Sequence, residues 1–279
     1  MFRKNKLAML VGEFLGTGLL TLLILSVKNS QLGLPYFVSA AAGLIMVMLT
    51  LALAGISGAI FNPAMTIGLW TVRKVRTLQA LSYIAVQLLG GAVAWWLFTY
   101  FTKVSGIPNS GHYNSRLLVA EALGTFVFAF VWAAAIYQRF SLYAKAFAIG
   151  GALAAGAIIA SIVSGAGDLN PAVALGTRTW GWGTYVLGPI IGAVVGFNLY
   201  NLLFVETELA EVAEAKDEKA GTAKVNATLT HSVIAADIDG RNKTADSKAK
   251  TAVVKKNVAK KKTATKKPAN SRRKNPNAV

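Results

Sequence analysis

The stretch from Phe61 to Trp70 reads FNPAMTIGLW, and a second stretch from Leu169 to Arg178 reads LNPAVALGTR. In both, the triplet Asn-Pro-Ala precedes a short run of apolar residues that favour helix. Asn is a preferred N-cap residue, and Pro is preferred at the first position of a helix. Each stretch therefore predicts a helix that begins at its Asn-Pro pair. The first, over 62–72, would be roughly 16 Å long at about 1.5 Å per residue.

The chain around these stretches has the composition of a membrane protein. Hydrophobic residues make up 54% of its 279 residues and charged residues only 15%, whereas about a quarter of a soluble domain is charged. Six segments approach the roughly 20 apolar residues that a membrane-spanning helix needs. They cover residues 8–26, 37–54, 78–101, 117–136, 146–163 and 184–204. Each run after Asn-Pro-Ala reaches only about half of a ~30 Å hydrocarbon core, so we expect it to enter the membrane without crossing it.

The sequence also repeats itself once. The segment EFLGTGLLTL begins at Glu13 and EALGTFVFAF begins at Glu121, 108 residues later, and the two Asn-Pro-Ala triplets are separated by the same 108 residues. Each unit holds three spans and one short helix, so repeat one covers about 7–101 and repeat two about 115–205. Because three is odd, the second unit is inverted in the membrane. We therefore predict an all-α membrane protein with six transmembrane helices plus two half-spanning re-entrant helices that meet near the midplane.

Charge divides the chain near Val205. Residues 1–205 hold 12 Lys and Arg against three acids, and residues 206–279 hold the other 17 basic and nine acidic residues. We predict a membrane domain over 1–205 and a basic, disordered, cytoplasmic tail over 206–279. The tail is interpreted either as simply solvated or as binding anionic lipid head groups, at about 1 kcal/mol per basic residue. Nucleic acid is disfavoured as the partner of the tail, because no aromatic residue lies between the basic residues and no folded nucleic-acid-binding domain accompanies them.

Lys and Arg in short loops predict the orientation, because they are enriched on the cytoplasmic side. With the N-terminus inside, eight basic residues lie at inner ends of spans and four at outer ends. The inner set is Arg3, Lys4, Lys6, Arg73, Lys74, Arg76, Arg139 and Lys145, and the outer set is Lys28, Lys103, Arg116 and Arg178. Both termini are therefore predicted to be cytoplasmic, in a multi-pass protein of the cell (plasma) membrane.

The first 205 residues carry no sequence pattern of catalysis. The chain has no cysteine, which excludes disulfides and thiolate metal sites, and its two histidines, His112 and His231, fall in loop and tail sequence. No cluster of His, Asp and Glu has metal-ligand spacing, and no phosphate-binding loop or nucleophile motif occurs. We therefore expect no enzyme activity, no cofactor and no metal.

The paired SGA…NPA boxes, the Glu-x-Leu-Gly-Thr opening of both halves and the six spans together resemble the aquaporins, or major intrinsic proteins. The resemblance covers about residues 7–205. One Asn-Pro-Ala triplet would be weak evidence, but two in register with a duplicated Glu motif are specific. Members of this family are passive channels for water and small uncharged solutes, usually tetramers with one pore per subunit. The resemblance implies the same function here, in a homotetramer within the lipid bilayer.

The resemblance also assigns roles to both boxes. Asn62 and Asn170 would offer side-chain N–H groups to water at mid-pore. The half-helix starts, each with roughly +0.5 charge, would repel protons and other cations. The residues that would hold the two starts against each other are Pro63, Ala64, Pro171 and Ala172.

Three acids remain in the membrane part. Glu13 and Glu121 lie inside predicted spans, where ionisable residues are functional by default. The resemblance implies that they are structural and accept N–H bonds from the loop before each half-helix. A proton-coupled transporter that uses this pair is the alternative from another class, and a membrane anchor for the basic tail is a third. Asp168 is interpreted first as a polar cap before the second half-helix and second as a residue of the outer mouth.

The residue after the second triplet departs from the family pattern. Most water-selective members have Arg there, which forms a constriction with an aromatic residue of the second span and often a His of the fifth; here it is Val173. The matching positions are Ala42 on the second span, Ala157 on the fifth (or Ile158 by a count without a gap) and Gly167. This uncharged ring predicts either a wider pore or an apolar one that dewets. Water is the default permeant, and glycerol, urea and dissolved gases are the alternatives.

Overall fold

The computed structural model describes residues 4–30, 34–104, 113–163, 167–179 and 181–205, and within these ranges it contains helices and no strands. The predicted disordered tail, 206–279, lies outside the described residues. The helices are α1 (Lys4–Lys28), α2 (Pro35–Ser57), α3 (Pro63–Thr71), α4 (Thr77–Thr102), α5 (Ser115–Tyr137), α6 (Leu142–Ala160), α7 (Pro171–Gly176) and α8 (Trp182–Tyr185). Residues 187–205 continue as a helix after α8.

The prediction of six membrane-spanning helices is confirmed. Those long and apolar enough to cross a bilayer are Asn5–Lys28, Pro35–Ser57, Thr77–Thr102, Ser115–Tyr137, Leu142–Ala160 and Trp182–Val205. The predicted bounds 146–163 of the fifth span were wrong by three to four residues. The helix begins earlier because the Ser141 hydroxyl accepts a hydrogen bond from the Ala144 N–H at 3.4 Å. Lys145 lowers the local hydropathy of the sequence without interrupting the helix.

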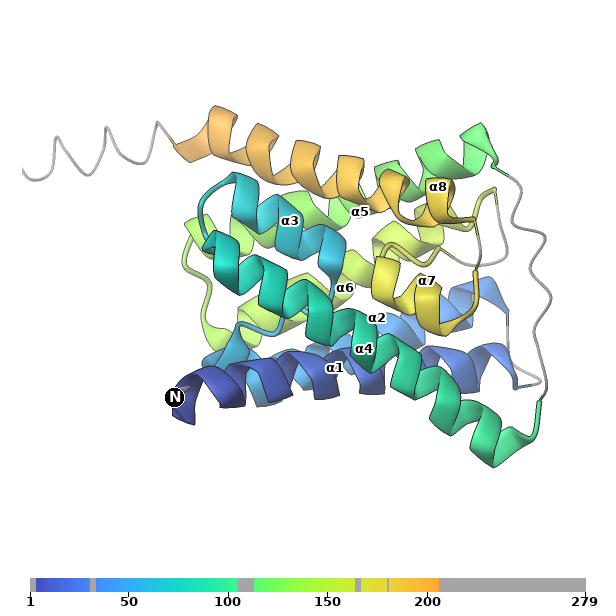
Figure 1. Cartoon of the computed structure of the whole chain (residues 1–279). Coiled ribbons are helices and arrows are strands. Elements are labelled where there is room, and N and C mark those ends of the chain that lie inside the picture. Colours follow the sequence, from blue (N-terminus) through green and yellow to red (C-terminus); the bar gives the residue numbers. More distant parts are fainter. Residues whose placement is uncertain (1–3, 31–33, 105–112, 164–166, 180, 206–279) are drawn as a thin grey trace, which may run out of the picture. The chain divides into compact units, whose positions relative to one another are not determined.

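Two short helices run from the middle of the bundle toward opposite ends (Figure 1). α3 has nine residues and α7 has six, so at about 1.5 Å per residue neither can cross a ~30 Å hydrocarbon core. α3 follows the second span of the first half and α7 follows the second span of the second half. The predicted fold, six spans plus two half-spanning helices in an inverted repeat, is therefore confirmed.

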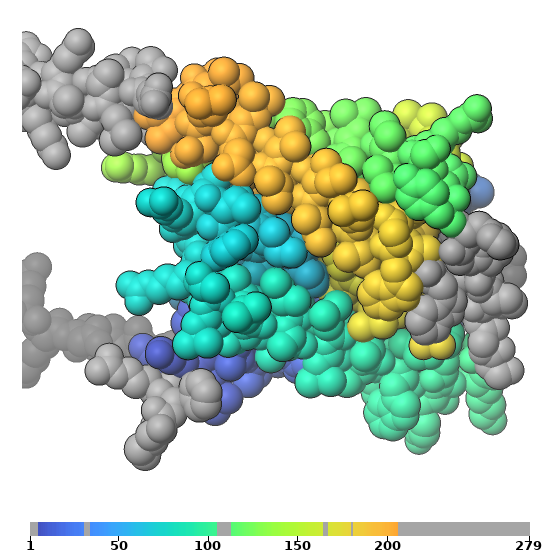
Figure 2. Space-filling view, turned by 45° about the horizontal axis from the view of Figure 1, so that its top comes forward, coloured from blue at the N-terminus to red at the C-terminus, as the bar shows by residue number. Residues whose placement is uncertain are grey.

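Glycines let the helices approach one another closely. In the space-filling view α3 lies between α4 and the last span (Figure 2). A Cβ atom at Gly68 of α3 would lie 2.6 Å from the ring of Phe197 in the last span. Where α2 meets α6, a Cβ atom at Gly43 would lie 2.6 Å from the carbonyl oxygen of Gly150. Close backbone packing of this kind holds helices together in lipid, where no hydrophobic effect drives them to associate.

Gly150 and Gly151 are neighbours on α6 and give a matched test of this packing. A Cβ atom at Gly150 would lie 2.5 Å from the carbonyl oxygen of Gly43, whereas one at Gly151 would have no atom within 4 Å. We expect Gly150→Ala to lower the free energy of unfolding by about 1–3 kcal/mol through overpacking. Gly151→Ala should leave it unchanged or raise it slightly. Titration of micellar protein with a denaturing detergent measures both, and equal losses would contradict this account.

Candidate functional site

The two half-helices begin in the same way, each with an asparagine as its N-cap. The Asn62 Oδ1 accepts hydrogen bonds from the Ala64 N–H at 2.9 Å and the Met65 N–H at 3.4 Å. The Asn170 Oδ1 accepts from the Ala172 N–H at 3.0 Å and the Val173 N–H at 3.4 Å. Pro63 and Pro171 follow at the first helical positions, where a missing N–H costs nothing. The side-chain oxygen of each asparagine is thus occupied by its own helix.

The amide nitrogens of the same two asparagines cross between the boxes. The Asn62 Nδ2 donates to the Leu169 carbonyl oxygen at 2.9 Å, and the Asn170 Nδ2 donates to the Phe61 carbonyl oxygen at 2.8 Å. Phe61 and Leu169 both adopt left-handed backbone, with φ of 51° and 50°, a conformation that is uncommon for bulky residues. An amide nitrogen has two N–H groups. Within the described ranges, one N–H of each asparagine therefore has no protein acceptor.

The loop before each half-helix is held by a buried glutamate. The Glu13 carboxylate accepts from the Ile60 N–H at 3.0 Å and the Phe61 N–H at 2.7 Å. The Glu121 carboxylate accepts from the Asp168 N–H at 2.9 Å and the Leu169 N–H at 2.8 Å. The two glutamates are fully buried. The two carboxylates thus accept hydrogen bonds from the loop before each box, including the N–H groups of the left-handed residues Phe61 and Leu169.

The repeats differ in what surrounds the glutamate. The Gln87 Nε2 donates to the Glu13 Oε2 at 2.8 Å and to the Thr66 Oγ1 at 3.1 Å. Thr66 lies on α3, so this network ties α1, α3 and α4 together. Among the described residues, no side chain donates to Glu121 in the same manner.

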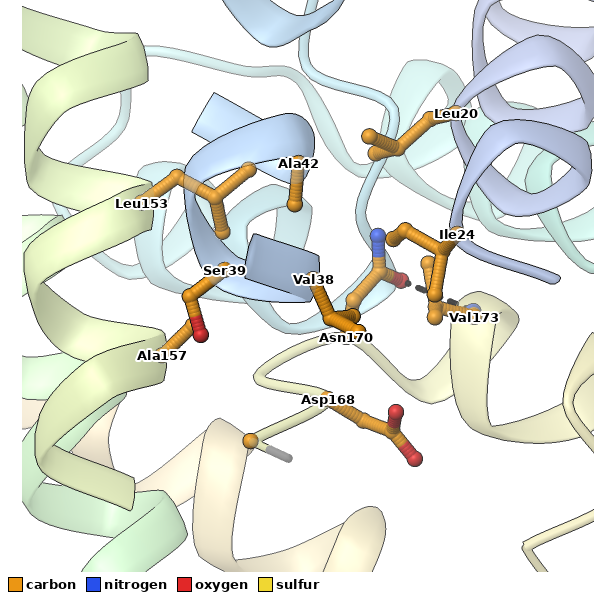
Figure 3. Close-up of a pocket in the computed structure, with 11 residues that line it drawn as sticks. Leu20, Ile24, Val38, Ser39, Ala42, Leu153, Ala157, Asp168, Asn170 and Val173 are labelled. Carbon is orange, nitrogen blue, oxygen red and sulfur yellow. Dashed lines mark hydrogen bonds between the residues drawn. The ribbon is translucent and has the colours of Figure 1, made fainter. Parts of the chain in front are cut away.

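A small cavity brings the four predicted constriction residues together (Figure 3). It offers about 10 Å³ to the centre of a water-sized molecule, which is room for about one water. Asn170 lies at this cavity, directly beside Val173 in the close-up. Its full lining is Leu20, Ile24, Val38, Ser39, Ala42, Leu153, Ala157, Gly167, Asp168, Asn170 and Val173.

On the fifth span, the sequence left a choice between Ala157 and Ile158, and only one of them lines the cavity. Ala157 lines the cavity and is buried, whereas Ile158 is 37% exposed and does not line it. Successive residues of a helix point about 100° apart, so only one of the two can face inward.

The prediction from the sequence did not include the bulky apolar side chains of the lining. Leu20 and Ile24 come from α1, which has no counterpart in the predicted four-residue ring, and Leu153 stands one helical turn before Ala157. The spacing of Leu20 and Ile24 by one turn was the available signal, because residues four apart share a helix face. These side chains occupy space that the small ring residues leave open.

Asp168 does not cap the half-helix, which corrects the first interpretation of this residue. Asn170 is the cap, while the Asp168 Oδ1 accepts from the Lys28 Nζ at 2.8 Å. The Asp168 Oδ2 accepts from the Thr179 Oγ1 at 2.8 Å. Arg178 has its guanidinium 5.7 Å from the ring centre of Trp95 and does not line the cavity.

Comparison with known proteins identifies the family of this chain. The sequence model of the family described as "Major intrinsic protein" matches residues 2–200. The chain is 31% identical to aquaporin Z of Photorhabdus laumondii over 229 residues, covering 71% of this chain and 98% of that protein. It is 30% identical to aquaporin NIP1-1 of Zea mays over 228 residues, covering 78% and 79%.

The fold is shared with a solved channel structure. The aquaglyceroporin from Plasmodium falciparum superposes with a TM-score of 0.61 at 22% identity, over 71% of this chain and 96% of the other. That similarity concerns the fold, while the family match and the 31% identical relative concern descent. On these grounds the chain belongs to the major intrinsic protein family, and it is a membrane channel for water or small solutes.

Proposed function

We propose that this channel passes water and small uncharged solutes passively and excludes ions and protons at the two Asn-Pro-Ala boxes. The observation that carries the proposal is the crossed pair of hydrogen bonds that the two asparagine side chains donate, each to a carbonyl oxygen of the other loop. These bonds leave one N–H of Asn62 and one of Asn170 for a passing water. Two helix starts meet there, each with a positive partial charge of up to roughly +0.5, and they repel hydronium and other cations. A water that accepts from both amides directs its own hydrogens elsewhere, which disfavours a proton wire.

We assign the outer constriction to Ala42, Ala157, Gly167 and Val173. Their side chains are small and uncharged, and Leu20, Ile24 and Leu153 narrow the same space. Room for about one water supports a narrow constriction rather than a wide pore, and its wall is mostly apolar, with Ser39, Asp168 and Asn170 as the polar residues. Such a wall offers few hydrogen-bond partners to a hydrated ion, so it favours neutral permeants of small cross-section.

The surroundings of the channel are proposed from charge and exposure. We place both termini in the cytoplasm and the chain in the plasma membrane, because basic residues are in excess at the inner ends of spans. Large apolar side chains such as Leu44, Trp96 and Leu202 are more than 60% exposed in the single chain, which supports their contact with lipid or with other subunits of a homotetramer. The tail is assigned to anionic lipid head groups.

Shrinkage of proteoliposomes tests the proposed function. Stopped-flow light scattering after a water, glycerol or urea gradient gives the three permeabilities, and an enclosed pH dye gives proton flux. We expect water flux well above that of bare lipid and proton flux at the lipid level. Water and solute fluxes that both equal those of bare lipid would overturn the proposal. Deletion of 206–279 should leave the fluxes intact, which separates a channel from an anchor for the tail.

Val173→Arg tests the assignment of the constriction. Val173 is fully buried at the cavity, so a larger side chain must occupy the space through which solutes pass. We expect glycerol and urea flux to fall by about tenfold or more and water flux to fall less. Val173→Leu fills part of the same space without charge and separates size from electrostatics. Equal losses of water and solute flux in Val173→Arg would count against this assignment.

A further inference from the structure

Lys28, at the end of α1, contacts a residue that lines the constriction cavity. Leu20 and Ile24 line the cavity, and Lys28 continues the same helix face one turn further along. Its Nζ lies 2.8 Å from the Oδ1 of Asp168, which does line the cavity. The other carboxylate oxygen of Asp168 accepts from Thr177 at 3.4 Å and Thr179 at 2.8 Å.

The burial of the pair is unequal. The Asp168 side chain is 2% exposed, whereas the Lys28 side chain is 29% exposed. It is the one salt bridge between side chains in the described part of the chain. Removing a carboxylate from water is unfavourable unless it is paired and hydrogen-bonded. The ammonium group of Lys28 and two hydroxyls supply those partners.

The fold itself does not need a carboxylate at this position. In the first repeat, the backbone N–H of Ile60 donates to the Glu13 Oε1 at 3.0 Å. In the second repeat, the Asp168 N–H makes the equivalent bond to the Glu121 Oε1 at 2.9 Å. An apolar side chain therefore suffices where the same backbone contact is made, so the carboxylate of Asp168 is an addition to the loop. Its position at the cavity connects this addition to permeation.

We propose that Lys28 is a specificity-determining residue that neutralises Asp168 and thereby keeps cations out of the cavity. Paired with Lys28, the Asp168 carboxylate presents no net charge to the cavity. Without Lys28, the carboxylate beside the cavity keeps only its two hydroxyl partners, and its uncompensated charge attracts hydronium and metal cations. Opposite charges a few ångströms apart interact strongly where water is sparse. This inference rests on the proposed function, because it concerns the charge selectivity of that channel.

Four variants separate charge from contact. Lys28→Met removes both, Lys28→Gln removes the charge and retains an N–H donor, and Lys28→Arg retains both. Lys28→Met combined with Asp168→Asn removes both charges of the pair. Lys103→Met is the matched control, since Lys103 is an exposed lysine at the C-terminal end of α4. Each variant is reconstituted full-length in vesicles, and proton flux is measured with an enclosed pH dye under a valinomycin-potassium clamp.

We expect proton flux to rise by about tenfold or more in Lys28→Met and Lys28→Gln. It should stay at the wild-type level in Lys28→Arg and Lys103→Met and return toward that level in the double variant. Wild-type proton flux in Lys28→Gln would overturn the inference, and so would a double variant as leaky as Lys28→Met. If Lys28→Met does not fold, Lys28→Gln and the double variant still decide. The water and solute fluxes of the wild-type protein are measured in the same vesicles. If the wild type conducts neither, the proposed function is wrong, and this outcome is distinct from a failure of the role of Lys28.

Discussion

Glu13→Ala is expected to lower the free energy of unfolding by about 3–5 kcal/mol, among the largest effects of any single substitution in this chain. The carboxylate accepts from the N–H groups of Ile60 and Phe61 and from the Gln87 amide. All three donors belong to buried residues, so alanine would leave the N–H groups of Ile60 and Phe61 and one N–H of Gln87 without this acceptor. The left-handed backbone of Phe61 would also lose its support.

Glu121→Ala is the matched comparison. Among the residues that the structure describes, Glu121 accepts from the N–H groups of Asp168 and Leu169, so its loss leaves two of these donors unpaired where that of Glu13 leaves three. We expect its effect to be smaller by about 1 kcal/mol, the typical net contribution of one hydrogen bond. Unfolding by a denaturing detergent measures both variants. A Glu13→Ala protein within about 1 kcal/mol of wild type would show that the loop is held by packing instead.

The second large effect is expected for Asn170→Ala. This change removes the N-cap of α7 and the bond from the Asn170 amide to the Phe61 carbonyl oxygen. Loss of a cap costs about 1 kcal/mol, and an unpaired buried carbonyl adds about 1–3 kcal/mol. We expect a total of about 2–4 kcal/mol and a fall in water flux of about tenfold, because the two helix starts no longer hold each other in place.

Asn114→Ala is the control for the cap alone. Asn114 is the N-cap of α5 and accepts from the N–H groups of Arg116 and Leu117 at 3.0 and 3.1 Å, but it is exposed. Its loss should cost about 1 kcal/mol and leave water flux unchanged. Detergent unfolding and stopped-flow scattering of the same preparations test this contrast. A water flux as high in Asn170→Ala as in Asn114→Ala would contradict a role of the box in permeation.

Local signals in the sequence predicted the architecture well. Span length and hydropathy are properties of continuous segments, and the Asn-Pro pair specifies a helix start within two residues. The repeat offset of 108 residues then related Glu13 to Glu121 and Asn62 to Asn170. The misplaced fifth span has a local cause as well. A hydropathy profile does not register the Ser141 cap. The charge of Lys145 lowers the profile, although this residue lies within the helix.

The lining of the cavity was predicted only in part. The positions matched by counting from the boxes, Ala42, Gly167 and Val173, do line it, and the choice on the fifth span falls on Ala157. Leu20 and Ile24 were not anticipated because no motif marks them. Which face of α1 points inward depends on how the helix is rotated against its neighbours, and that rotation is fixed by packing rather than by local sequence.

The sequence by itself determined that this chain is a membrane bundle with two inverted halves and two half-spanning helices, because length, hydropathy and capping chemistry act within short segments. Only the tertiary structure decided that the amides of Asn62 and Asn170 cross to each other's loops and that Lys28 meets Asp168 across 140 residues. Contacts between distant segments depend on how the whole bundle packs. The residue types name the candidate partners, and the packing brings those partners into contact.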